Sequence, residues 1–167
     1  GLEWTAANTL SITPSLPAQW NEAEVDGVPL GNSHVDITFQ RQGTALAVHL
    51  AGQGASSVKL TSRTPGAKLL RGALLIPLPP VEVGIDHGLP QPGAVTSQLK
   101  VLDQKYSSRT LQLRLSAPGN SHHVLFLRKN DPNLHLRADG AAISASQLTI
   151  DFPQGDGFVE KLVTIAW

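Results

Sequence analysis

Apolar and polar residues alternate most regularly between Val35 and Leu50, in two short segments joined by a glycine-containing turn. In each segment the large apolar residues recur at every second position, which is the period of a β-strand with one buried face. We therefore predict a β-hairpin whose core face carries Val35, Ile37, Phe39, Leu46, Val48 and Leu50.

The predicted turn sets the register of this hairpin. A two-residue loop at Gln42-Gly43 places Phe39 opposite Leu46, so that large apolar side chains meet across the strands. An even loop is favoured because a slip of one residue would turn the apolar face of one strand to solvent. The same register puts Asp36 opposite His49 on the polar face, where we interpret them as an exposed charge pair of little energetic weight and not as a catalytic pair.

Strand patterns continue along nearly the whole chain, separated by turns rich in Gly, Pro, Asn and Ser. The mostly apolar run Leu69–Leu78, interrupted by Arg71 and Gly72, is interpreted as one strand. Further on, two alternating segments flank Ser107, and only an odd loop such as Ser107–Arg109, or a bulge, places Val101 opposite Leu115. The fold class predicted is all-β: a two-sheet antiparallel β-sandwich, jelly-roll-like, with little or no helix. Residues 9–167 are expected to form one domain, with residues 1–8 as a linker or a remnant of expression.

Composition excludes several classes of partner. The chain has 13 Lys+Arg against 13 Asp+Glu, so no net charge steers it to nucleic acid or to an anionic membrane, and we expect neither as a partner. No apolar run approaches the roughly 18 residues of a spanning helix. The absence of Cys excludes disulfides and thiolate metal sites but leaves the compartment open, with an exported location, periplasmic or secreted, favoured. Because the chain has no Met, we expect a processed product or a segment of a longer protein.

No motif of a common catalytic or nucleotide-binding site is present: there is no phosphate-binding glycine loop, no zinc-protease helix motif and no nucleophile elbow. His122 and His123 are adjacent, so in a strand they point to opposite faces and cannot chelate one metal. The irregular segment Val81–Gly93 contains Asp86-His87, which either cap their own loop or form an acid/base pair, and we favour the first interpretation. We assign no catalytic residue, metal or cofactor.

The segment before the hairpin, LSITPSLPAQW, contains a Pro-x-Leu-Pro-x-x-Trp turn at Pro14, Leu16, Pro17 and Trp20. This turn and the hairpin that follows, as far as Gln53, resemble the start of the C-terminal β-sandwich domain that follows the (α/α)6 catalytic barrel in several bacterial glycoside hydrolase and glycoside phosphorylase families. The resemblance implies that the catalytic carboxylates lie in an upstream barrel of the same protein. It also implies that this chain is a non-catalytic accessory domain that packs against that barrel.

An independent carbohydrate-binding module is the alternative function, and a protein-interaction domain of an unrelated exported protein is the third. Sandwiches that bind sugars present exposed aromatic faces, and this chain has four large amphipathic aromatic residues, of which Trp167 is expected to be buried. The candidates for carbohydrate contact are Tyr106, Arg109, Asp86 and His87. Trp4 and Trp20 are the candidates for a domain interface, although Trp20 is also expected to be a packing anchor in its turn. Several coplanar exposed aromatics would favour sugar binding, whereas one apolar patch containing either tryptophan would favour domain packing.

Overall fold

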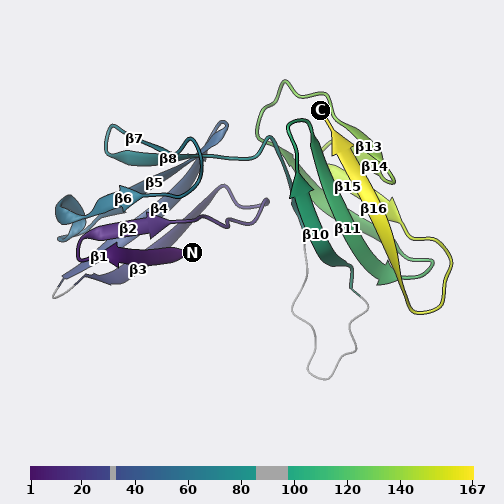
Figure 1. Ribbon diagram of the computed structural model, residues 1–167, viewed down its shortest axis with the longest axis horizontal. Coiled ribbons are helices and arrows are strands. Elements are labelled where there is room, and N and C mark those ends of the chain that lie inside the picture. The colour runs from purple at the N-terminus through teal and green to yellow at the C-terminus, as the bar shows by residue number, and fades with distance from the viewer. Residues whose placement is uncertain (31–32, 86–97) are drawn as a thin grey trace. The chain divides into compact units, whose positions relative to one another are not determined.

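The computed structural model describes residues 1–30, 33–85 and 98–167, which are nearly all β (Figure 1). The one helical element within these ranges is a single 3-10 turn, η1 (Ala55–Ser57). The prediction of an all-β, sandwich-like fold is therefore confirmed. Among the described residues, no helix has the length and apolar character that crossing a membrane would need.

The chain divides into two compact units, Gly1–Pro80 and Val81–Trp167, and each has its own sheets and its own core. This division differs from the single domain expected over residues 9–167. Residues 1–8 also differ from the expected linker, because β1 (Leu2–Ala6) pairs with β2 (Thr9–Ile12) in an antiparallel ladder. Alternation identifies strands but does not say which strands share a core.

The first unit contains a three-stranded and a five-stranded sheet. The strand order of the small sheet is β1-β2-β6 (Lys59–Thr61), and β2 and β6 are parallel. The order of the larger, antiparallel sheet is β3 (Glu22–Leu30), β4 (Ser33–Gln42), β5 (Ala45–Ala51), β8 (Ala73–Pro77) and β7 (Lys68–Leu70). Apolar side chains from both sheets form one core, with the buried members Leu10, Ile12, Ile37, Val48, Leu60, Leu74 and Ile76.

The β4–β5 hairpin forms where it was predicted, with a two-residue loop, but that loop is Gly43-Thr44. Phe39 therefore faces Val48 and not Leu46, a shift of two residues that keeps the apolar residues on one face. The predicted pairing of Asp36 with His49 is wrong, because His49 lies opposite Thr38. The Asp36 carboxylate instead accepts a hydrogen bond of 2.8 Å from the backbone N–H of Gly27.

The second unit contains two four-stranded sheets that form a sandwich, green to yellow in Figure 1. One has the order β10 (Lys100–Tyr106), β11 (Thr110–Pro118), β16 (Phe158–Ala166) and β13 (Arg137–Asp139). The other has the order β14 (Ala142–Ser144), β15 (Gln147–Asp151), β12 (His122–Lys129) and β9 (Val81–Gly84). The buried core includes Leu111, Leu113, Leu115, Val163 and Ile165 from the first sheet and Leu125, Leu127, Leu148 and Ile150 from the second.

The predicted bulge in the β10–β11 hairpin is confirmed. The register shifts between Val101 and Asp103, and this shift places Val101 opposite Leu115. Residues Ser107–Arg109 lie between the two strands. The hydrophobic pattern was therefore sufficient to predict an irregularity that no turn residue marked.

Candidate functional site

The proline-rich segment between β2 and β3 forms a turn that an arginine from β4 holds in place. The backbone N–H of Trp20 donates to the carbonyl of Pro17 at 3.0 Å. The Arg41 guanidinium donates through Nε to the carbonyl of Trp20 at 2.8 Å, and Nη2 lies 3.4 Å from each of the carbonyls of Leu16 and Pro17. A proline supplies no backbone donor, so the side-chain donors of Arg41 satisfy carbonyls that a regular ladder would otherwise pair.

Beside this turn lies a hollow of about 220 Å³, which we call the Trp20 hollow. The described residues that line it have no charged side chain and are mostly apolar: Gly1, Leu2, Ile12, Thr13, Pro14, Ser15, Leu16, Pro17, Trp20, Ala23, Val25 and Phe39. The large apolar side chains on its rim are open to solvent, with Trp20 55% exposed and Leu2 and Val25 each 38% exposed. Three solvent-exposed large hydrophobic residues thus line one concave surface.

Two edge strands supply the sides of the Trp20 hollow. Leu2 belongs to β1, the first strand of the small sheet, and Val25 belongs to β3, the first strand of the large sheet. Ala23 lies directly opposite Phe39 in the ladder, and Val25 opposite Ile37, so this face of β3 points to the interior of the sandwich. The hollow is therefore an accessible part of the apolar interior, between the first strands of the two sheets.

The two tryptophans predicted as interface candidates differ in their surroundings. Trp4 is partly buried and packs against the core of its unit, so its indole stabilises the sandwich. Trp20 is largely exposed, contrary to the expectation of a buried packing anchor. Its backbone anchors the turn through Pro17 and Arg41, while its side chain faces solvent. Trp167, which was expected to be buried in the last strand, directly follows β16 and is partly buried against the core of the second unit.

Tyr106, a carbohydrate-contact candidate, uses its hydroxyl within its own unit. The hydroxyl donates to the carbonyl of Val81 on β9 at 2.9 Å and accepts from Nε2 of Gln104 at 2.8 Å. Burial raises the pKa of the Tyr106 phenol above 10.0; the hydrogen bond from Gln104 opposes this effect, and the nearby Glu82 carboxylate adds to it. The phenol therefore joins the edge of one sheet to the other sheet, and Tyr106 as a whole is 39% exposed.

Of the other carbohydrate-contact candidates, Arg109 is the one that the structure describes. Arg109 is exposed in the β10–β11 turn, and its backbone carbonyl accepts a hydrogen bond of 3.1 Å from the N–H of Trp167. Asp86 and His87 lie outside the described residues. The structure thus brings Tyr106 and Arg109 to one hairpin.

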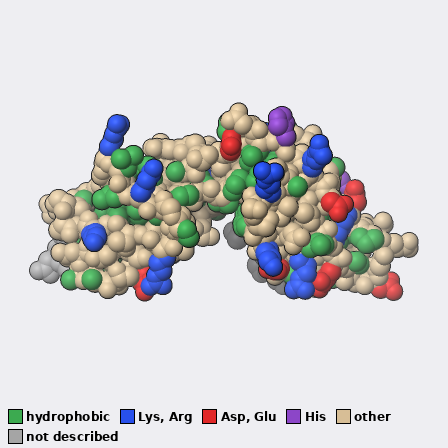
Figure 2. Space-filling view, turned by 45° about the horizontal axis from the view of Figure 1, so that its top comes forward, with side chains coloured by type: hydrophobic (Ala, Val, Ile, Leu, Met, Phe, Trp, Pro, Cys, Tyr) green, Lys and Arg blue, Asp and Glu red, His purple; other side chains and the backbone are tan. Residues whose placement is uncertain are grey.

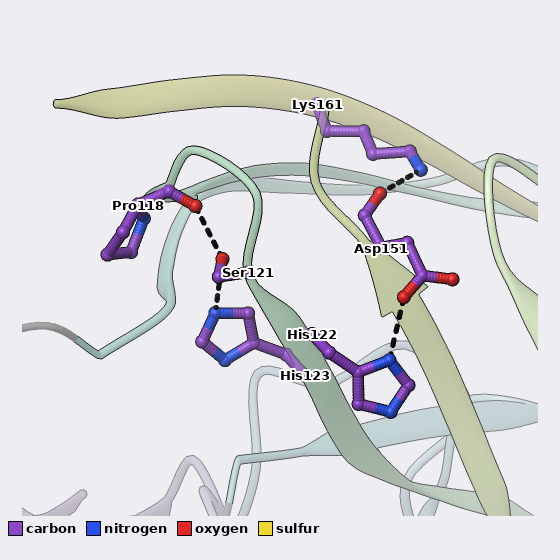
Figure 3. Close-up of polar contacts among 6 residues, drawn as sticks. All are labelled: Pro118, Ser121, His122, His123, Asp151 and Lys161. Atoms are coloured by element: carbon purple, nitrogen blue, oxygen red, sulfur yellow. Dashed lines mark hydrogen bonds and ion pairs between the residues drawn. The ribbon is translucent and has the colours of Figure 1, made fainter. Parts of the chain in front are cut away.

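Figure 3 shows a polar cluster of the second unit that contains serine, histidine and aspartate side chains without the geometry of a catalytic triad. Nδ1 of His122 lies 2.7 Å from Oδ1 of Asp151, whereas Nε2 of His123 lies 3.0 Å from the hydroxyl of Ser121. A triad needs one imidazole between the hydroxyl and the carboxylate. Here adjacent positions of β12 separate the two imidazoles, as their spacing predicted.

The partners of these histidines also indicate structural roles. The His123 ring meets the Phe152 ring edge to face at 5.7 Å, and Lys161 donates to the backbone carbonyl of Asp151 at 2.6 Å. His122 and Asp151 are both largely exposed to solvent, where an ion pair contributes little. Among the residues that the structure describes, no group of three or more His, Asp or Glu side chains could hold a metal ion.

No protein-family model, curated protein or solved structure matches this chain. The resemblance of its first third to accessory sandwiches of glycoside hydrolases therefore stays a prediction. The site is defined by its own geometry: the exposed Trp20 indole, the apolar hollow beside it and the Arg41 side chain that holds the turn. The resemblance pointed to the turn, but Arg41 was missed, because no local pattern tells that a strand residue contacts a turn 21 positions away.

Proposed function

We propose that this chain is a non-catalytic accessory module of a larger carbohydrate-active enzyme, and that the Trp20 hollow packs against the catalytic domain of that enzyme. The observation that carries the proposal is the convergence of Trp20, Leu2 and Val25, all solvent-exposed, on one mostly apolar concave surface. Exposed apolar surfaces of this kind are typical of interaction sites. Trp is also the residue type most enriched among those that dominate binding energy at interfaces.

The rigidity of the turn supports this proposal. Arg41 contacts the carbonyls of Leu16, Pro17 and Trp20, so the backbone that carries the indole is ordered before any partner arrives. Binding then costs little further conformational entropy, because two prolines and a side-chain clamp have already restricted the segment. A packing surface between domains benefits from such preorganisation.

The polar chemistry of the described residues gives less support to a catalytic role. The lining of the Trp20 hollow contains neither a carboxylate nor an imidazole, while glycoside cleavage uses a pair of carboxyl groups. In the second unit, the Ser121 hydroxyl contacts the His123 imidazole, whereas the Asp151 carboxylate contacts the His122 imidazole. In this proposal the bond-breaking groups belong to the catalytic domain.

Binding of carbohydrate by this chain itself is the second candidate function, and the exposed Trp20 indole is the observation that favours it. The positions of the other exposed aromatic residues give no further support to carbohydrate binding. Tyr106 and Phe158 belong to the second unit, and they lie on opposite faces of their sheet, since Tyr106 pairs with the core residue Leu111 and Phe158 with Pro118. Lys100 also covers the Phe158 ring, at 4.5 Å from its centroid.

The test uses the full-length product of the gene that encodes this chain, beside the chain alone. Trp20→Ala is expected to lower the unfolding temperature of the full-length protein, by a loss of about 2 kcal/mol of packing energy, and to change that of the chain alone much less. Phe158→Ala, at a comparably exposed aromatic position, is the matched control and should affect both proteins equally. Equal effects of Trp20→Ala on the two proteins would refute domain packing at this surface.

A titration of the chain with neutral oligosaccharides tests the second candidate. The proposal predicts no saturable heat and no change in tryptophan fluorescence. A dissociation constant below about 1 mM, equivalent to about −4 kcal/mol, that is lost in Trp20→Ala would instead make the chain a carbohydrate-binding module.

A further inference from the structure

Most acidic residues of the first unit lie on β3 and β4, and β3 also lines the Trp20 hollow. The five acidic residues of this unit are Glu3, Glu22, Glu24, Asp26 and Asp36. Four of them lie on β3 and the adjacent β4, and we call these four the acidic edge: Glu22, Glu24, Asp26 and Asp36. The three on β3 are exposed to solvent. The fourth, Asp36, accepts a hydrogen bond from the backbone of Gly27 on β3.

The basic residues of this unit lie elsewhere or have a fixed role. Lys68 is on β7, at the opposite end of the five-stranded sheet, roughly 19 Å from β3 at the usual strand spacing, and Arg71 lies in the turn that follows β7. Lys59 is on β6 in the other sheet, and Arg63 lies 3.7 Å from Glu3. Arg41 lies on β4, next to Gln40, the residue opposite Glu22, and keeps its positive charge while it donates to the turn carbonyls. In Figure 2 the displayed face of this unit accordingly carries more Lys and Arg than Asp and Glu side chains.

With four carboxylates and the single guanidinium of Arg41 on β3 and β4, the acidic edge keeps a net negative charge. Charges further apart than the Debye length, ~8 Å at physiological ionic strength, are largely screened from each other. A partner that brings cations to within a few ångströms of Glu22 and Glu24 would therefore gain more than the distant Lys68 can supply.

Strand β3 contributes residues to both the Trp20 hollow and the acidic edge. Ala23 and Val25 line the Trp20 hollow, and Glu22 and Glu24 alternate with them on the opposite face of the same strand. A partner that covers this edge strand meets the apolar hollow on one side and carboxylates on the other. We propose that the surface of the catalytic domain that occupies the Trp20 hollow is an apolar side chain flanked by lysine or arginine residues. This inference rests on the proposed function and adds the chemistry of the partner to it.

A second copy of the chain fits this surface poorly. Self-pairing along β3 would bring the carboxylates of Glu22, Glu24 and Asp26 near those of the other copy, and like charges across a ladder are destabilising. Complementary potentials across an interface favour association and suppress the wrong partner. The acidic edge therefore favours a basic partner over a copy of itself.

The test is a titration of the intact chain with three capped five-residue peptides, in which leucines at the second and fourth positions alternate with lysine, serine or glutamate. Binding is followed by the NMR shift of the Trp20 indole N–H. We expect the lysine peptide to bind about fivefold more tightly than the serine peptide at low salt, and the glutamate peptide most weakly. This preference should largely disappear at high salt.

Two double variants distinguish an effect of the acidic edge on peptide binding from an effect of the net charge of the chain. Glu22→Gln combined with Glu24→Gln should remove most of the preference for lysine. The matched control, Asp156→Asn combined with Glu160→Gln, removes two exposed carboxylates from the second unit and should leave the preference unchanged.

The outcomes distinguish the inference from the proposed function. Equal binding of the lysine and serine peptides, or a preference that survives Glu22→Gln with Glu24→Gln, would overturn the basic partner. Absence of binding by all three peptides would overturn it as well. Domain packing itself would then still be judged by the effect of Trp20→Ala in the full-length protein, which does not depend on the charges.

Discussion

Arg41 and Trp20 explain how one turn exposes an indole without disordering the backbone that carries it. The guanidinium contacts three carbonyls in a segment where two prolines cannot donate, so the turn keeps one conformation while its largest side chain faces water. Charge-assisted hydrogen bonds of this kind are about twice as strong as neutral ones. The exposed indole is thus held by its backbone and not by its own burial.

Arg41→Met keeps much of the aliphatic length of the side chain but removes these donors. We expect a loss of about 1–3 kcal/mol in the free energy of unfolding of the first unit, measured by urea denaturation, because the turn carbonyls lose charged donors. Arg114→Met removes a guanidinium that only lies 3.9 Å from Glu160 at the surface, and should cost less than about 0.5 kcal/mol. Equal losses in the two variants would show that Arg41 does not hold the turn.

Tyr106 provides a prediction at high pH. Its raised pKa means that the folded state holds the phenol proton more tightly than the unfolded state. The stability from this group is therefore complete below about pH 10 and is lost as the pH rises through the higher folded pKa. Because Tyr106 is the sole tyrosine of the chain, tyrosinate absorbance reports it alone. The midpoint should lie above 10.0 in the folded protein and near 10 in urea; equal midpoints would contradict the buried hydroxyl contacts.

At this scale the sequence predicted part of the site. The Pro14, Leu16, Pro17 and Trp20 pattern identified the turn, and Trp20 was one of two interface candidates. The exposure of the Trp20 indole could not be predicted in this way. It depends on the contact of Arg41 with the turn and on the packing of the strands, which no local sequence pattern indicates. Tyr106 was selected for its amphipathic ring, but its hydroxyl partner on β9 is 25 residues away in the sequence.

At the scale of elements, hydrophobic period predicted strands better than it predicted where they turn. The hairpin of β4 and β5 kept the predicted faces with a register shifted by two residues, which alternation cannot distinguish. The run Leu69–Leu78, expected as one strand, is instead the β7–β8 hairpin. Arg71 and Gly72 form its turn with φ values of 51° and 82°, a conformation that glycine favours and that an apolar run conceals.

Ala145 tests the turn between β14 and β15, where its φ of 50° is unfavourable for a residue with a Cβ atom. Ala145→Gly should raise the stability of the second unit by ~0.5–1 kcal/mol, since relief of strain outweighs the added entropy of the unfolded chain. Ala142→Gly, at an exposed position of β14, should lower it by a similar amount. Thermal unfolding of both variants checks the pair, and destabilisation by Ala145→Gly would contradict the left-handed turn.

At the scale of the whole molecule, the chain carries two cores where one was expected. Each unit buries its own apolar residues between its own sheets, and Pro80 and Val81 mark the boundary. The proline-rich exit at Pro77, Pro79 and Pro80 was visible in the sequence. These prolines did not identify a boundary between two units, because the strand patterns on their two sides look alike.

Separate production of residues 1–80 and 81–167 tests this division. We expect each fragment to give β-type circular dichroism and to unfold cooperatively by itself, because no strand pairing crosses the boundary among the described residues. The intact chain should unfold as the sum of the two transitions. A fragment without structure would mean that its core is completed by the other unit.

The central claim, that the Trp20 hollow is covered by the catalytic domain of a larger enzyme, is tested most directly by hydroxyl-radical footprinting of Trp20. The oxidation rate of this indole is measured in the chain alone and in the full-length protein, with Phe158 as the internal reference. The account predicts a several-fold lower rate for Trp20 in the full-length protein and an unchanged rate for Phe158. An equal Trp20 rate in the two proteins would contradict the account.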